Sequence, residues 1–231
     1  MAHPLLWLRS QQVHYAAALR WQKQQVEIML NSPHKQPDRL LFLEHPSVYT
    51  IGRSGRLHDL LPHQNVCSTI PVLMTDRGGK ITYHGPGQLV AYLLRDLRPH
   101  ALMAARKHLF QLEEVVIRCL ASLGLQAVRE QQYPGVWVGD AKIAAVGVRI
   151  KQGITYHGIS LNRDPDLRFY EGIVPCGLPD RPVTSLSCLG ISLTREALEE
   201  LLLTAFCELF QYEVVDLPMD TLAQTLALAE S

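Results

Sequence analysis

Hydrophobic residues recur at helical spacing in three stretches of the chain. The first covers residues 13–30, where valine, alanine, methionine and leucine share one face of a helix. The second covers residues 102–123 and ends before Gly124, which is a typical C-terminal cap. The third starts after Thr194, whose hydroxyl suits an N-cap, and repeats leucines at helical spacing. We therefore expect three helices, separated by long segments with a different pattern.

Between the predicted helices, short apolar runs indicate strands. Two of them flank a His-Pro turn, one is apolar throughout, and the last two form a hairpin across a Lys-Gln-Gly turn. These runs are residues 40–43, 47–51, 87–94, 142–150 and 154–161. Hairpins and separate helices favour an α/β fold of the α+β type, with a mixed, mainly antiparallel sheet and flanking helices. The sequence lacks regular strand–helix alternation and a Gly-x-Gly-x-x-Gly motif, which disfavours a Rossmann fold.

Charge and hydropathy narrow the class of protein. The 231 residues contain 22 lysines and arginines against 22 aspartates and glutamates, so a bulk electrostatic grip on nucleic acid or an anionic membrane is not indicated. No apolar run approaches the roughly 18 residues that a membrane helix needs, and the N-terminus lacks a secretory signal. We expect a cytoplasmic monomer that folds as a single domain over residues 1–231, with a helical C-terminal element at about 194–231.

The cysteine and histidine content gives no sign of a disulfide framework or a metal centre. The sequence has five cysteines at wide spacings and no Cys-x-x-Cys pair, so disulfides are not expected in the predicted compartment. None of the ten histidines forms a His-x-His or His-Glu-x-x-His motif. The sequence therefore predicts no bound metal.

Cys176 is the candidate nucleophile. It lies between Pro175 and Gly177, and this restricted turn can present a side chain while leaving backbone N–H groups accessible for an oxyanion. The alternative is a buried structural cysteine, the usual situation of a free thiol. A thiol is mostly protonated at neutral pH, so a nucleophilic cysteine needs a cation or a base nearby. Lys142, at the start of an apolar run, could pair with the thiolate; the alternative is an ordinary solvated lysine.

A glycine-rich string at residues 76–88 is the second candidate feature. Such a segment brings the backbone close to another group, often a ligand. Its Arg77, Lys80 and His84 favour a binding loop over the alternative of two tight turns around a short strand. A second His-Gly pair begins at His157, on the far strand of the predicted hairpin. Taken singly, that histidine is more often a satisfied polar residue than a catalyst.

Four motifs in this order resemble the lipoyl(octanoyl) transferase family, and the match extends from about residue 40 to residue 186. The motifs are Arg77-Gly78-Gly79 with Thr82-Tyr83-His84-Gly85-Pro86-Gly87-Gln88, Gly135-Val136-Trp137-Val138 with Lys142-Ile143-Ala144, His157-Gly158-Ile159-Ser160-Leu161-Asn162, and Ile173-Val174-Pro175-Cys176-Gly177 with Thr184-Ser185-Leu186. Two positions depart from the family pattern: Leu93 stands where proline is expected, and Arg163 stands where an apolar residue is expected. Neither position touches the chemistry that the family would perform.

The resemblance implies an acyltransferase with the fold of the biotin and lipoate protein ligases. Such an enzyme takes an octanoyl group from octanoyl-acyl carrier protein and places it on a specific lysine of lipoyl domains, in the 2-oxoacid dehydrogenases and the glycine cleavage H protein. By motif match, Cys176 carries the acyl group and Lys142 is its partner. The residues that the resemblance places at the acyl site are Arg77, Gly78, Gly79, Lys80, Ile81, Thr82, Tyr83, His84, Ala145, Val146, Gly147, Gly158, Ile159 and Ser160.

This chemistry is expected to need no cofactor. Exchange between two thioesters is nearly isoenergetic and transfer from a thioester to an amine runs downhill, so neither step requires ATP. Lys142 would act twice, first as the ammonium that stabilises the thiolate and then, once neutral, as the base for the incoming amine. Three alternatives stay open: an ATP-dependent lipoate or biotin protein ligase, an amidotransferase between lipoyl domains, and an inactive module that binds acyl carrier protein.

Overall fold

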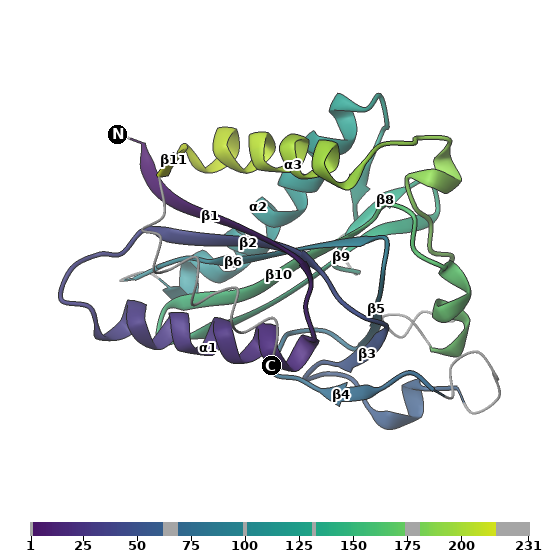
Figure 1. Ribbon diagram of the computed structural model, residues 1–231, viewed down its shortest axis with the longest axis horizontal. Coiled ribbons are helices and arrows are strands. Elements are labelled where there is room, and N and C mark those ends of the chain that lie inside the picture. Colours follow the sequence, from purple (N-terminus) through teal and green to yellow (C-terminus); the bar gives the residue numbers. More distant parts are fainter. Residues whose placement is uncertain (1, 62–68, 99–100, 131–132, 174–180, 216–231) are drawn as a thin grey trace.

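An eight-stranded sheet runs through the centre of the molecule, and helices cover both of its faces (Figure 1). The computed structural model describes the chain except residues 1, 62–68, 99–100, 131–132, 174–180 and 216–231. In spatial order the strands are β11 (Tyr212–Val215), β1 (His3–Gln12), β2 (Asp38–Glu44), β6 (Gln88–Leu94), β10 (Ile154–Asn162), β9 (Ala141–Lys151), β8 (Val136–Val138) and β7 (Val128–Arg129). β1 pairs in parallel with both of its neighbours, and the other pairs are antiparallel. The predicted mixed, mainly antiparallel sheet is confirmed.

A smaller, three-stranded sheet lies beside the main one. It has the order β4 (Val72–Met74), β3 (Val48–Ile51) and β5 (Ile81–His84), with β3 parallel to β4 and antiparallel to β5. Its buried tyrosines and isoleucines form a cluster of their own, to which Ile173 contributes. Short 3₁₀ turns lie between β3 and β4, at Leu57–Asp59, and between β10 and α3, at Leu167–Gly172 and Ser187–Leu189. The small sheet matters here because β5 carries the glycine-rich string toward the main sheet.

The three predicted helices are all present. They are α1 (Tyr15–Asn31), α2 (Ala101–Ser122) and α3 (Arg195–Phe210), and α1 lies on the opposite face of the sheet from α2 and α3 (Figure 1). Thr194 caps α3, because its Oγ1 accepts a hydrogen bond from the backbone N–H of Ala197 at 3.2 Å. Gly124, just beyond α2, has φ +79°, a conformation that favours glycine.

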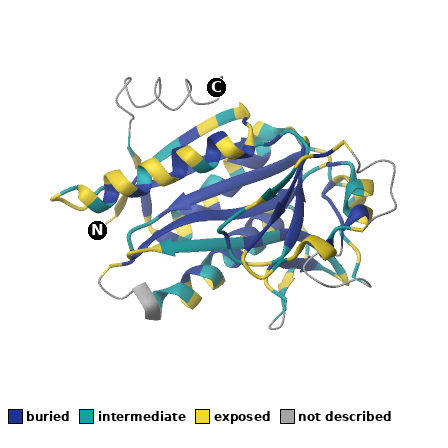
Figure 2. Ribbon diagram, turned by 90° about the horizontal axis from the view of Figure 1, so that it is seen from below, coloured by how far each residue is buried: buried dark blue, intermediate teal, exposed yellow. Residues whose placement is uncertain are grey.

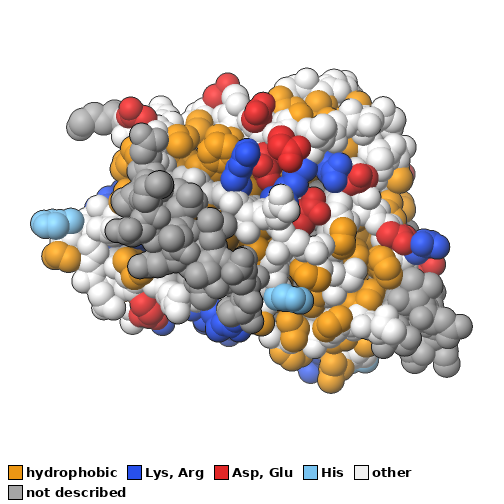
Figure 3. Space-filling model, in the orientation of Figure 1, with side chains coloured by type: hydrophobic (Ala, Val, Ile, Leu, Met, Phe, Trp, Pro, Cys, Tyr) orange, Lys and Arg blue, Asp and Glu red, His pale blue; other side chains and the backbone are white. Residues whose placement is uncertain are grey.

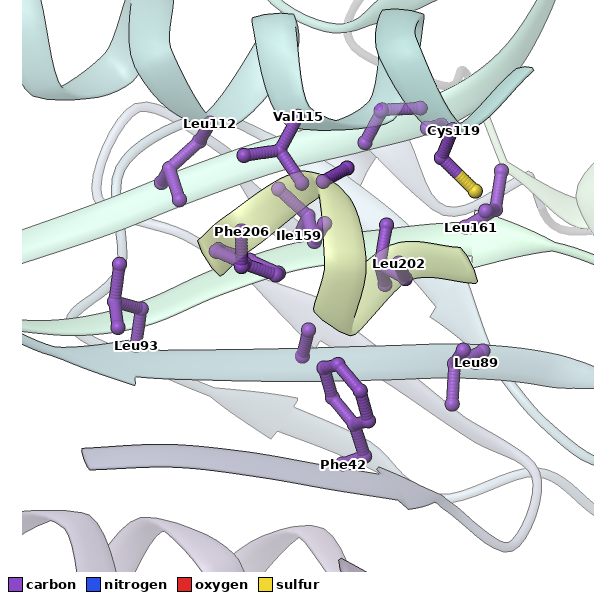
Figure 4. Packing of buried hydrophobic residues seen from close by; sticks show 14 of the residues in the cluster. Phe42, Leu89, Leu93, Leu112, Val115, Cys119, Ile159, Leu161, Leu202 and Phe206 are labelled. Atoms are coloured by element: carbon purple, nitrogen blue, oxygen red, sulfur yellow. The ribbon is translucent and has the colours of Figure 1, made fainter. Parts of the chain in front are cut away.

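The main core lies between the sheet and the helices α2 and α3. In Figure 4, side chains of α2 such as Val115 point toward sheet residues such as Phe42 and Leu161, and Phe206 of α3 lies among them. A second cluster fills the space between α1 and the opposite face of the sheet, around Trp21. Figure 2 shows the consequence, with dark blue central strands and a helix α1 that has one buried and one exposed side. Because the core covers both faces of the sheet, the central strands β6 and β10 are buried along their whole length.

The predicted hairpin between residues 142–150 and 154–161 is also confirmed. Gln152 and Gly153 both have positive φ, 46° and 91°, as expected for a tight two-residue hairpin turn. The strands β1, β4, β7, β8 and β11 were not predicted from the sequence. Residues 81–84, predicted as part of a binding loop, form β5, an outer strand of the small sheet.

On the face that Figure 3 shows, charged side chains of both signs gather mainly in one area near the middle of the view. Basic and acidic side chains are interspersed near the position of α3, in keeping with the ion pairs of Arg9 and Arg195 to Glu199. Among the described residues, no helix is long and apolar enough to cross a membrane.

Candidate active site

A cavity of about 260 Å³ lies where the glycine-rich string meets the β9–β10 hairpin. Three stretches supply most of its wall: residues 77–82, residues 145–148 on β9 and residues 157–160 on β10. Ile81, Val146 and Ile159 give it a predominantly apolar lining. An enclosed apolar space with a few polar groups is the usual form of a small-molecule site.

The glycine-rich string lies directly against β9. The backbone N–H of Gly78 donates to the carbonyl of Val148 at 3.0 Å. A Cβ on Gly147 would lie 3.0 Å from the Gly78 carbonyl oxygen, so the two backbones could not approach as closely with a larger residue there. The glycines at these positions therefore allow one wall of the cavity to consist of backbone.

Arg77 fixes this string to the small sheet. Its Nη2 donates to the carbonyl and to the hydroxyl of Thr50 at 2.6 and 2.8 Å, and its Nη1 donates to the carbonyl of Gly78 at 2.9 Å. The residue is buried. A guanidinium that bridges a strand and a loop in this way holds the loop in one conformation.

Neutral histidines form part of the cavity surroundings. Nδ1 of His45 donates to the Val13 carbonyl at 2.6 Å, so its Nε2 accepts from the hydroxyl of Tyr92 at 2.7 Å. Nδ1 of His84 donates to Oε1 of Gln88 at 2.6 Å, and His84 lines the cavity. Burial lowers the pKa of His45 to about 4 and holds that of His84 well below its ordinary value. Both rings are therefore uncharged at neutral pH.

His157 also lines the cavity and has an unusual backbone conformation. Its φ is +63°, which is uncommon for a residue with a side chain and is found at functional sites. Its Nε2 donates to Asp76 at 3.0 Å, and the hydroxyl of Tyr156 donates to the other oxygen of the same carboxylate at 2.5 Å. Burial lowers the pKa of His157. The ring is thus a neutral donor to Asp76, a role that the sequence alone did not reveal.

Lys142 reaches the cavity from β9, where it is 7% exposed. Its Nζ donates to the carbonyl of Pro134 at 2.6 Å and lies 5.3 Å from the centre of the Trp137 ring. An ammonium over an indole ring is stabilised by the negative face of the ring. The alternative of an ordinary solvated lysine is therefore wrong for this residue.

The backbone of Lys142 is paired with the segment that follows Cys176 in the sequence. Its N–H donates to the carbonyl of Pro182 and its carbonyl accepts from the N–H of Thr184, both at 2.9 Å. Cys176 itself lies outside the described residues. In the sequence, Cys176 precedes Pro182 by six positions.

The family model of the lipoyl protein ligase A/B catalytic domain matches residues 14–207. The chain belongs to this family. An octanoyltransferase from Magnetococcus marinus is 51% identical over 172 residues, which are 74% of this chain and 78% of the relative. An octanoyltransferase from a Synechococcus strain is 39% identical over 234 positions, covering 95% of this chain and 84% of the relative. The resemblance seen in the motifs is confirmed, and this member of the lipoyl protein ligase A/B family is an acyltransferase.

Solved structures of lipoate protein ligases share the fold. A bi-partite lipoate protein ligase from Thermoplasma acidophilum gives a TM-score of 0.71 at 17% identity, covering 97% of this chain and 92% of that chain. A lipoate-protein ligase A bound with ATP gives 0.70 at 18% identity, covering 98% and 94%. The predicted similarity to the lipoate ligase fold is confirmed.

Within this family member, the cavity brings together most of the residues that the sequence singled out. The residues that line it are Lys142, Arg77, Gly78, Gly79, Lys80, Ile81, Thr82, His84, Ala145, Val146, Gly147, Gly158, Ile159 and Ser160. Tyr83 is not among them. It alternates with its neighbours along β5, and its ring packs on Phe169 and Tyr49 in the core of the small sheet.

Further residues that line the cavity were not among those predicted for the acyl site. They are Tyr15, Val90, Tyr92, Leu109, Tyr133, Pro134, Val148 and His157. Only His157 had a sequence signal, its His-Gly pair. Among the described residues, no group of three histidine, cysteine, aspartate or glutamate side chains is arranged to hold a metal ion.

Proposed function

We propose that the chain moves an octanoyl group from octanoyl-acyl carrier protein to the specific lysine of lipoyl domains, through a thioester on Cys176. The proposal rests above all on the cavity in which Lys142 lies beside the apolar wall of Ile81, Val146 and Ile159. The wall suits a saturated acyl chain, because each methylene buried there contributes about 0.8 kcal/mol. The 2-oxoacid dehydrogenases and the glycine cleavage H protein are the proposed carriers of the acceptor domains.

Loading of the enzyme is the first half of the reaction. The Cys176 thiolate, paired with the Lys142 ammonium, attacks the carbonyl carbon of the donor thioester. The bond from that carbon to the sulfur of the carrier's prosthetic group then breaks, and Lys142 gives its proton to the departing thiolate. The products are octanoyl-Cys176, a neutral Lys142 and a free carrier thiol, so no external proton or nucleotide is consumed.

Transfer to the acceptor reverses the roles. The neutral amine of the acceptor lysine attacks the Cys176 thioester, the carbon–sulfur bond breaks, and the amine loses one proton to Lys142. The amide is released and the ammonium–thiolate pair is restored. The Gly78 N–H is already donated to the Val148 carbonyl, so the backbone N–H of Gly79, in the string that lines the cavity, is the one we assign to the oxyanion in both halves.

Intact-mass measurement tests this scheme directly. We expect the wild-type chain mixed with octanoyl-acyl carrier protein to gain the mass of one octanoyl group, and to lose it when a lipoyl domain is added. Cys176→Ala should gain no mass. Lys142→Arg should turn over at least a thousandfold more slowly, because arginine cannot release a proton. Near-normal turnover by either variant would contradict the scheme.

The three alternatives give different outcomes in the same experiment. An ATP-dependent ligase, the activity suggested by a fold neighbour that binds ATP, would transfer octanoate only when ATP is present. An amidotransferase would accept an octanoylated lipoyl domain as donor in place of acyl carrier protein. A binding module would form a complex with the carrier and gain no covalent mass.

A further inference from the structure

Glu113 is a buried carboxylate on α2 that is connected through one peptide group to Lys142, the proposed acid–base residue. It is 3% exposed and follows the cavity-lining Leu109 by one helical turn, so both residues lie on the same face of the helix. Its Oε1 accepts a hydrogen bond from the backbone N–H of Gly135 at 2.8 Å, and its Oε2 lies 3.5 Å from Nε of Arg129. Both oxygens thus face donors, as expected for the ionised form.

One peptide group connects Glu113 to Lys142. The Gly135 N–H that binds Glu113 and the Pro134 carbonyl that accepts from Lys142 Nζ belong to the same planar unit, and they point in opposite directions. A carboxylate on the N–H side increases the negative charge on the carbonyl oxygen, because hydrogen bonds in a chain polarise one another. The carbonyl is therefore a better acceptor for an ammonium than for a neutral amine.

The backbone at this peptide is closely fitted to the lysine. Gly135 has φ +131°, and a Cβ there would lie 2.4 Å from Cε of Lys142 and 2.6 Å from the carbonyl oxygen of Ala144. A residue with a side chain would have to displace the lysine or the peptide. The position therefore requires glycine.

We propose that Glu113 is a positioning residue for Lys142: through the Pro134–Gly135 peptide it orients the Nζ atom and favours its ammonium form during thioester formation. This inference rests on the proposed function, since it assigns Glu113 a part in the acid–base cycle of Lys142. Burial raises the pKa of Glu113, while the Gly135 N–H, Arg129 and Lys142 act in the opposite direction.

Other charged groups near Lys142 set the background for a pH test. Arg181 stacks on the Trp137 ring that Lys142 also faces, at 4.7 Å, and is itself paired with Glu130 and Asp140. Arg129 forms an ion pair with Glu113 through the oxygen that does not bind Gly135, and so partly neutralises its charge. Removal of Glu113 and removal of Arg129 should therefore shift the protonation of Lys142 in opposite directions.

The test compares pH profiles of octanoyl transfer for the full-length wild type, Glu113→Gln, Arg129→Gln and the control Glu208→Gln. Glu208 is an exposed carboxylate on the neighbouring helix α3. In Glu113→Gln we expect a kcat about tenfold lower at the wild-type optimum, an unchanged KM for the donor, and an alkaline limb about one pH unit closer to neutral. Arg129→Gln should move that limb to higher pH, and Glu208→Gln should match the wild type.

The role of Glu113 would be overturned if the alkaline limb moved in the same direction in Glu113→Gln and Arg129→Gln. It would also be overturned if both variants folded and neither limb moved. Arg129→Gln keeps the inference testable where Glu113→Gln is too unstable to assay. Lys142→Arg and Cys176→Ala are assayed beside them. Transfer by either of these would refute the proposed catalytic cycle itself, whereas inactivity of both with unshifted profiles refutes only the inference about Glu113.

Discussion

Burial determines which side chains around the cavity carry charge. His45 and His84 are neutral at physiological pH because burial lowers the pKa of both rings by more than the hydrogen bonds from their Nδ1 atoms raise it. An acyl thioester has no net charge and could not pair with a buried charge in the cavity wall. Neutral histidines therefore avoid the free-energy cost of an unpaired charge beside the acyl group. The cationic side chains that line the cavity, Arg77, Lys80 and Lys142, are then the positive groups available to a developing oxyanion or thiolate.

Asp76 gives a pH-dependent prediction at the level of one residue. The hydrogen bond from His157, aided by that from Tyr156, holds the pKa of Asp76 well below its ordinary value of 3.8. A depressed carboxyl pKa stabilises the folded state above the unfolded pKa and loses that contribution as pH falls through the folded value. Asp76→Asn should therefore lower the free energy of unfolding by about 1 kcal/mol at pH 7, since partial exposure screens the pair.

Urea denaturation at several pH values checks this expectation. The difference between wild type and Asp76→Asn should be constant between about pH 7 and pH 5 and should shrink below about pH 4. The control is Asp140→Asn, because the Asp140 side chain is 93% exposed and its removal should change stability by less than about 0.5 kcal/mol. A difference that grows on acidification would contradict the assignment of Asp76 as the stabilised anion.

At the level of elements, the sequence predicted those with a clear apolar pattern and missed those without one. The three helices have an apolar face at helical spacing, and the central strands β2 and β6 contain continuous apolar runs, because all of them are buried against the core. Strand β1 has only two fully buried residues, Leu5 and Leu8, separated by three positions, so its pattern resembles neither a strand nor a helix. Strands β7 and β8 are two and three residues long, too short for any period to show.

The same reasoning explains which site residues could be predicted. Contiguous motifs revealed the string around Arg77 and the hairpin positions, because several residues of one segment face the cavity together. Tyr15 and Leu109 each enter singly, from helices whose other residues serve the core. Glu113 looks in sequence like any polar residue on a helix surface, and only the tertiary structure places its carboxylate on the Gly135 N–H.

The N-cap of α3 offers a prediction about one element. Thr194→Ala removes the acceptor for the Ala197 N–H, and we expect a loss of about 1 kcal/mol in the free energy of unfolding. Octanoyl transfer should be unchanged, because neither residue lines the cavity. Thr204→Ala is the matched control: that hydroxyl is exposed on the same helix and bonds only back to the Glu200 carbonyl, so its loss should be neutral. Equal effects of the two substitutions in chemical denaturation would show that the cap contributes nothing.

For the whole molecule, the important property is that the cavity is assembled from all its layers. Helix α1 contributes Tyr15, α2 contributes Leu109, β5 of the small sheet contributes Ile81, and β9 and β10 of the main sheet contribute Val146 and Ile159. Several of these residues also belong to the hydrophobic clusters that hold the layers together. The depth of the cavity is therefore fixed by the packing of the whole fold, and it cannot adjust to each acyl chain independently.

A cavity of fixed depth should select the length of the acyl chain. The selectivity is measured by comparing kcat/KM for enzyme loading from acyl carrier proteins that carry six-, eight- and ten-carbon acyl groups. Loss of two buried methylenes, about 1.6 kcal/mol in total, should make the six-carbon donor about fifteenfold poorer than the eight-carbon one. The ten-carbon donor should also be poorer, because close-packed walls resist displacement.

Val146→Leu adds volume to the wall and should shift the preference toward six carbons, whereas Val128→Leu, at a position that is 54% exposed, should not. Equal rates with all three donors would mean that the cavity does not measure the chain, and the acyl group would then have to lie elsewhere.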